Sequence, residues 1–160
     1  MENIFIEKRI CLHSKYLDQD IQNNILKKLQ ELTDNECTKE DGYIININKD
    51  IDILDHKIGR ANTDNIFTIK FEASILKPKE GLKVDGIVCM VYKDGIFINI
   101  LDRQKMLIPK AKLQEYNFDE NKKQYTDKNK NIIKLGQKIE AIMTGVVYNN
   151  KTFSCFGSIV

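Results

Sequence analysis

Residues 78–88 read PKEGLKVDGIV and residues 94–98 read DGIFI, and the first of these stretches begins at about the midpoint of the 160-residue chain. Pro78 and Gly81 are typical of a turn. An apolar strand pattern follows, and the short polar turn that ends at Gly95 predicts a hairpin, because glycine accepts backbone angles that other residues avoid. These stretches therefore predict the first two strands of a small β-barrel.

The second strand of this hairpin alternates between two kinds of residue. Ile96, Ile98 and Ile100 fall on one face, and Phe97 falls on the other. In an OB-type barrel, an aromatic residue on the outer face of this strand is where a nucleic acid base would stack. The alternative is that Phe97 fills a second core or an interface with another protein.

The rest of the second half also has mainly strand patterns. Strands are expected at residues 82–92, 95–101, 104–108, 137–148 and 151–159. Asn149 and Asn150 are expected to take left-handed backbone angles in the last hairpin turn. The polar segment 116–134 is long for a connection in a compact barrel, so it is either a mobile loop or contains a helical turn. Residues 80–160 are thus expected to form an all-β OB-type barrel.

The first half has a mixed pattern. Strands are expected at residues 3–12, 42–48 and 66–76, a helix at 16–33, and an irregular polar loop at 50–64. Asp18 is the expected N-cap of the helix. Apolar residues recur at helical spacing at Ile21, Ile25, Leu26, Leu29 and Leu32. A helix against an antiparallel sheet makes residues 1–79 an α+β module.

Composition and charge exclude several classes of protein. Hydrophobic residues make up 42% and charged residues 30%, which is typical of a folded chain. No apolar run approaches the roughly 20 residues of a membrane span, and we expect no membrane association. The four cysteines are scattered, which favours reduced, buried thiols inside a cell.

The two halves differ in charge. Residues 1–80 carry 12 basic and 15 acidic side chains, whereas residues 81–160 carry 13 basic and 8 acidic ones. The basic half could attract a phosphate backbone, or its lysines could simply form a solvated face.

The residue pattern predicts neither catalysis nor a cofactor. His13 and His56 have no Cys or second His at ligand spacing, so no metal site is expected. The glycines lack the Gly-Lys-Ser/Thr signature of a phosphate-binding loop. The expected class is a binding protein without catalytic residues.

Motifs spread over the whole chain resemble one family. They are, in order, Gly42-Tyr43-Ile44-Ile45, Phe67-Thr68-Ile69-Lys70-Phe71-Glu72-Ala73, Leu76-Lys77-Pro78, Val84-Asp85-Gly86, Gly95-Ile96-Phe97, Asn117-Phe118-Asp119 and Gly157-Ser158-Ile159. Their order and spacing resemble the larger stalk subunit of multisubunit RNA polymerases, a family that comprises the seventh subunit of RNA polymerase II and its archaeal counterpart. The resemblance implies a ribonucleoprotein-like tip module followed by a ribosomal-S1-like OB barrel.

The resemblance also implies partners and a location. The partners would be the RNA polymerase core subunits, the smaller stalk subunit (the counterpart of the fourth subunit of RNA polymerase II) and single-stranded nascent RNA. The divergence from the family and the abundance of Ile, Asn and Lys, which is typical of an AT-rich genome, fit a large DNA virus or an intracellular parasite as the source. The expected location is intracellular: the nucleus, or the viral factory and virion for a viral protein.

Two sets of site residues are expected. The RNA-binding residues are Tyr92, Lys93, Phe97, Arg103 and Lys105. The residues that contact the polymerase core, in the loop at 50–64, are Ile53, Leu54, Ile58 and Gly59. The alternative for the aliphatic residues is that they tuck back under their own sheet. Asp94 stands where many OB-type RNA binders have a second aromatic, so RNA binding is expected to be weak.

Two other functions fit parts of the sequence. A free-standing OB-fold RNA-binding factor in translation or RNA decay would explain the barrel but not the acidic first module. A scaffold protein whose barrel binds only protein would need no RNA contact.

Overall fold

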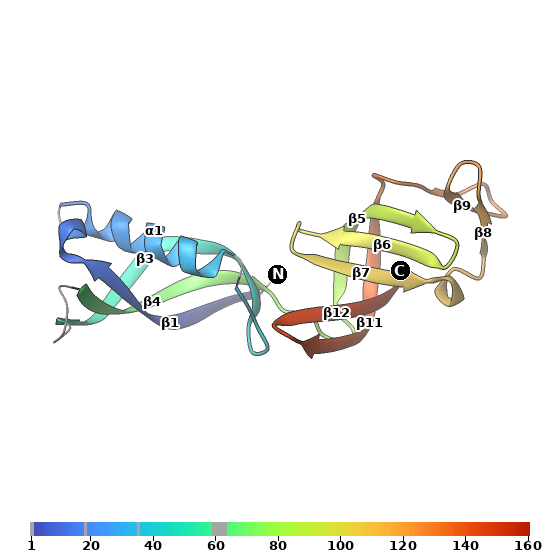
Figure 1. Ribbon diagram of the computed structural model, residues 1–160. Coiled ribbons are helices and arrows are strands. Elements are labelled where there is room, and N and C mark those ends of the chain that lie inside the picture. The colour runs from blue at the N-terminus through green and yellow to red at the C-terminus, as the bar shows by residue number, and fades with distance from the viewer. Residues whose placement is uncertain (1, 18, 35, 59–63) are drawn as a thin grey trace. The chain divides into compact units, whose positions relative to one another are not determined.

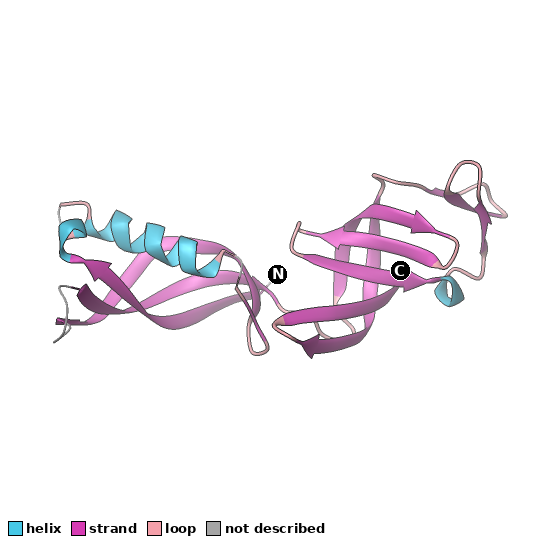
Figure 2. Cartoon of the chain, viewed as in Figure 1, coloured by secondary structure: helices cyan, strands magenta, loops and turns pink. Residues whose placement is uncertain are grey.

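The computed structural model describes residues 2–17, 19–34, 36–58 and 64–160. The chain divides into two compact units, Met1–Lys77 and Pro78–Val160. The first contains the α-helix and the second consists mainly of strands (Figures 1 and 2).

Within the described ranges, no helix has the length and apolar character needed to cross a membrane.

The first unit is an antiparallel sheet with one helix packed against it. Its elements are β1 (Glu2–His13), a 3₁₀ turn (Ser14–Tyr16), α1 (Ile21–Thr33), β2 (Cys37–Thr38), β3 (Gly42–Ile58) and β4 (Asp64–Leu76). The strands lie in the order β1-β4-β3-β2, and all neighbouring pairs are antiparallel. The β4 strand therefore lies at the centre of the sheet, between β1 and β3.

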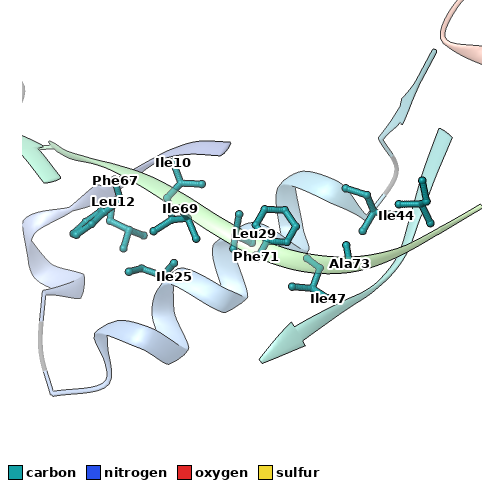
Figure 3. Packing of buried hydrophobic residues seen from close by; sticks show 11 residues of the cluster. Ile10, Leu12, Ile25, Leu29, Ile44, Ile47, Phe67, Ile69, Phe71 and Ala73 are labelled. Atoms are coloured by element: carbon teal, nitrogen blue, oxygen red, sulfur yellow. The ribbon is translucent and has the colours of Figure 1, made fainter. Parts of the chain in front are cut away.

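The core of this unit lies between α1 and β4 (Figure 3). Ile25 and Leu29 of the helix are fully buried, and so is every second residue of β4 from Phe67 to Ile75. The predicted apolar stripe is confirmed in its central part. Leu32, near the end of the stripe, remains half-exposed.

The helix begins later than the sequence predicted. Ser14–Tyr16 forms a separate 3₁₀ turn, and the ring nitrogen of His13 accepts a hydrogen bond from the backbone N–H of Lys15 at its start. Asp20 occupies the N-cap position of α1 without a side-chain cap. The expected N-cap, Asp18, lies outside the described residues. The predicted helix therefore begins too early, because Tyr16 belongs to the 3₁₀ turn and α1 begins at Ile21.

The expected loop at 50–64 is wrong over most of its length. Strand β3 continues through Ile58 and remains paired with β4. The register shifts between Ile44 and Asn46, again before Ile51, and again just after Ile53. Each irregularity interrupts the period-two pattern by which a strand is recognised, because a bulge moves the following side chains to the opposite face. Residues 59–63 lie outside the described ranges.

The second unit contains the predicted closed barrel. Its strands are β5 (Lys83–Tyr92), β6 (Gly95–Ile100), β7 (Gln104–Pro109), β11 (Lys138–Asn149) and β12 (Thr152–Ile159). They close in the order β11-β12-β7-β6-β5, with β12 parallel to β7 and the other pairs antiparallel. Ile96, Ile98 and Ile100 are buried inside, as the alternation predicted.

The segment 116–134 is neither a mobile loop nor a helical turn. It forms a three-stranded antiparallel sheet of β8 (Tyr116–Asp119), β9 (Gln124–Asp127) and β10 (Ile132–Ile133). A short 3₁₀ turn, Lys110–Lys112, precedes it. These strands are too short for alternation to be visible among polar residues.

The last hairpin turn is shifted by one residue from the prediction. Asn150 and Lys151 have left-handed φ values of 51° and 63°, and Asn149 is the last residue of β11.

Candidate nucleic-acid interface

The hairpin of β5 and β6 brings two of the predicted site residues together. The rings of Tyr92 and Phe97 meet edge to face with centroids 6.4 Å apart. The Tyr92 hydroxyl also donates to the sulfur of Met90 at 3.1 Å. Phe97 lies between two residues that point into the barrel, so its side chain is on the outer surface. The candidate interface thus has two adjacent aromatic rings.

A buried tyrosine that sequence reasoning missed donates a hydrogen bond to the turn of this hairpin. Tyr125 of β9 is only 1% exposed, and its hydroxyl donates to the backbone carbonyls of Tyr92 and Lys93, the latter at 3.0 Å. Burial raises the pKa of Tyr125 and the Asp94 carboxylate raises it further, against a lowering hydrogen bond at Gly95. The phenol therefore remains a hydrogen-bond donor at neutral pH. The only sequence signal was one tyrosine in a polar segment.

The turn also depends on a glycine. Gly95 has φ of 147°, and a Cβ built on it would lie 2.5 Å from the carbonyl oxygen of Ile108. The backbone of β7 therefore approaches β6 closely at this point, where Gly95 pairs with Pro109. A side chain at position 95 would separate the two strands.

The predicted basic residues are spread over the hairpin of β5 and β6, the turn after it and strand β7. Lys93 is exposed in the turn beside Tyr92. Lys105 is exposed on β7, where it pairs with Asn99. Arg103 lies in the turn after β6, at the opposite end of that strand from Lys93. The structure therefore groups Tyr92, Lys93 and Phe97 and leaves Arg103 apart from them.

The aliphatic residues predicted to contact the polymerase core lie on the outer half of β3. Ile53, Leu54 and Ile58 are 42%, 50% and 74% exposed, so they do not tuck beneath the sheet. Gly59 lies outside the described residues. β2 pairs only with Gly42 and Tyr43. Among the described strands, the rest of β3 therefore forms an edge of the sheet.

His56, a residue of β3, packs against the neighbouring strand β4. The His56 ring stacks on Phe67 with centroids 4.3 Å apart, and its Nε2 lies 2.9 Å from the side-chain oxygen of Asn65. In the part of the chain that the structure describes, no three His, Cys, Asp or Glu side chains are grouped to hold a metal ion. The four cysteines were expected to be buried; Cys37 and Cys155 are, whereas Cys89 is partly exposed and Cys11 is exposed.

Comparison with known proteins matches the barrel to a named domain. The model of the S1 RNA binding domain matches residues 77–155. A solved structure, the apo form of Mycoplasma genitalium RNase R, covers 51% of this chain and 13% of that chain at 18% identity and a TM-score of 0.42.

Several named relatives point to one protein. "DNA-directed RNA polymerase II subunit RPB7" of Saccharomyces cerevisiae is 26% identical over 156 residues, which cover 94% of this chain and 90% of the yeast protein. The RPB7 of Glycine max is 24% identical over 96 residues, 59% of this chain. Here the aligned part spans about half the length of the relative, 54%.

A viral protein is also similar. "Uncharacterized protein 250L" of Invertebrate iridescent virus 6 is 31% identical over 91 residues, which cover 57% of this chain and 62% of the viral protein. The matches named RNA polymerase II subunit RPB7 or subunit 7 come from plants, yeasts and Dictyostelium discoideum. The chain is therefore similar to RPB7, and its residues 77–155 match the S1 RNA binding domain.

Proposed function

We propose that this chain is a non-catalytic stalk subunit of a DNA-directed RNA polymerase. Its first unit, as a ribonucleoprotein-like tip module, would dock on the polymerase core, and its barrel would contact nascent RNA. The observation that carries the proposal is the match to yeast RPB7, because it spans both units and not the barrel alone. A free-standing OB-fold factor would need no counterpart for the first unit.

The proposed RNA contact is weak and tolerant of sequence. Stacking on an aromatic side chain contributes about 1–3 kcal/mol per base and requires no particular base. Lys93 and Lys105 would add a salt-dependent attraction to phosphates. Asp94 opposes that attraction beside Tyr92. The polymerase would compensate by delivering its transcript at high effective concentration.

The proposed docking surface is the exposed edge of β3. Three aliphatic side chains there, at Ile53, Leu54 and Ile58, remain open to solvent. Exposed apolar groups along a strand edge favour contact with another protein. The core subunits are the proposed partners, together with a smaller stalk subunit. The nucleus, or the viral factory and virion if the source is viral, is the proposed location.

The docking proposal is tested by changing Ile53, Leu54 and Ile58 to Ser together. The triple variant is expected to lose the polymerase core in affinity purification while the smaller stalk subunit remains bound. Leu135→Ser on the second unit, which is similarly exposed, is the matched control and should retain both. Retention of the core by the triple variant would contradict docking through this edge.

The RNA proposal is tested with Phe97→Ala, Arg103→Ala and Lys105→Ala combined. Crosslinking of this variant to nascent RNA should fall, while polymerase assembly and nucleotide addition stay unchanged because no residue of this chain is proposed to do chemistry. Unaltered crosslinking would move the RNA path to another part of the barrel, such as the lysine-rich segment 110–134.

A further inference from the structure

Four barrel strands place apolar side chains in one row on the outer surface. Met90 of β5 pairs with Phe97 of β6, Phe97 pairs with Leu107 of β7, and Leu107 pairs with Phe156 of β12. The residues on either side of Phe97, Leu107 and Phe156 along their strands are buried in the barrel. Because side chains alternate along a strand, these three members of the row point outward.

Phe156 is the most exposed aromatic ring of this row, with 42% of its surface open to solvent. Its antiparallel partner on β11 is Gly145. A Cβ built on Gly145 would lie 3.6 Å from Cδ2 of Phe156, in ordinary contact. A residue with a side chain would fit there and cover one side of the ring, so the glycine leaves that side uncovered.

A positive charge lies beside the row. Lys105 is two residues before Leu107 on β7 and points to the same outer face. Its exposed side chain is therefore placed to meet a phosphate group of a strand whose bases lie along Phe97, Leu107 and Phe156. An apolar row flanked by a lysine favours a single-stranded nucleic acid over an uncharged protein segment.

We propose that Phe156 is a second base-stacking platform for single-stranded RNA, continuous with Phe97 through Leu107. The inference rests on the proposed RNA contact of the barrel and extends it to a residue just beyond the S1 match, which ends at 155. Two strand spacings separate Phe97 from Phe156, which is about 10 Å. A stacked strand rises about 3.4 Å per nucleotide, so roughly four nucleotides span both rings.

The test measures binding of the full chain to fluorescently labelled oligo(U) of about eight nucleotides, a length within the range that one OB fold covers. Phe156→Leu keeps the apolar contact and removes the aromatic face, and we expect affinity to fall about five-fold or more. Phe156→Tyr keeps the face and should bind within about two-fold of the unchanged chain. Phe5→Leu, an exposed phenylalanine of the first unit, is the matched control and should change nothing.

Phe97→Leu separates this inference from the proposed function. Weaker binding by Phe97→Leu with unchanged binding by Phe156→Leu would overturn the second platform and leave the RNA contact in place. Equal losses of affinity in Phe156→Leu and Phe156→Tyr would also overturn it, because a base stacks on a tyrosine ring as well as on a phenylalanine ring. No measurable binding by the unchanged chain would overturn the RNA contact and the inference together. Unchanged binding by both leucine variants would overturn stacking at Phe97 and at Phe156 and would move the RNA path to another part of the barrel.

Discussion

Tyr125→Phe tests whether the three-stranded sheet of β8, β9 and β10 positions the protein hairpin of β5 and β6. The variant keeps the buried ring and its contact with Phe118, whose centroid lies 5.2 Å away. It removes only the hydroxyl that donates to the carbonyls of Tyr92 and Lys93. The hydroxyl has one proton, so the two contacts share a single donor and their energies do not add.

The expected loss of stability is that of a single hydrogen bond, because the hydroxyl has one proton to donate. One hydrogen bond contributes about 0.5–1.5 kcal/mol net, and a carbonyl left without its partner raises the cost. Tyr92 is exposed, so water can reach part of the freed hairpin. We therefore expect Tyr125→Phe to lower the free energy of unfolding of the barrel by about 1–2 kcal/mol.

The loss also depends on pH. Because the pKa of Tyr125 is raised above its ordinary value of 10.0, the folded chain holds this proton more tightly than the unfolded chain. Its contribution to stability is complete below pH 10 and declines as pH rises through the folded pKa. The advantage of the unchanged chain over Tyr125→Phe should shrink in that window.

The assay combines urea unfolding with hydrogen exchange of the backbone amides in residues 90–98. Tyr116→Phe, on the neighbouring strand β8 of the same small sheet, is the control. Faster exchange in Tyr125→Phe alone would show that the hydroxyl holds the hairpin. A free energy of unfolding within about 0.3 kcal/mol of the unchanged chain, with unchanged exchange, would refute the reasoning, because even the weakest net hydrogen bond exceeds that value.

Three further predictions concern stability. Ile98→Ala removes a fully buried side chain of the barrel and should cost about 2–5 kcal/mol in urea unfolding, whereas the exposed Ile87→Ala should cost under about 1 kcal/mol. Gly42→Ala should lower the melting temperature by several degrees, because Gly42 has φ of 71° and its added Cβ would lie 2.2 Å from a carbonyl oxygen; an unchanged melting temperature would contradict that. Asp127→Asn should destabilise the chain at neutral pH. Despite partial desolvation, hydrogen bonds from Asn131 and Asn129 lower the pKa of Asp127 below 3.8. The stability that the carboxylate adds is therefore present above pH 3.8 and disappears as pH falls through the folded pKa. A pH-independent difference between the two proteins would contradict this last reasoning.

The barrel could be predicted because strand β6 has a regular alternation of residues. Ile96, Ile98 and Ile100 alternate without interruption, and β6 ends one residue before its expected end. The pairing of β12 with β7 could not be predicted, because parallel strands far apart in the sequence carry no local signal of their register. Phe156 was therefore not recognised as a neighbour of Phe97, although its alternation with buried Cys155 was present in the sequence.

The first unit was harder to predict where its strands are irregular. Three register shifts along β3 moved aliphatic residues such as Ile53 out of a period-two pattern, so an ordered strand resembled a loop. The aliphatic character of that segment was still informative, because Ile53, Leu54 and Ile58 remain exposed in the strand. Tyr125 was missed for a different reason: a four-residue strand among polar residues is too short to show a period.

The most direct measurement of the central proposal is mass spectrometry of proteins that co-purify with an affinity-tagged copy of this chain from its native cell or virion. The proposal predicts the large subunits of an RNA polymerase together with a smaller stalk subunit. The variant with serine at Ile53, Leu54 and Ile58 should lose the large subunits and retain the smaller stalk subunit. A stable, monomeric chain that purifies without any polymerase subunit would contradict the stalk assignment.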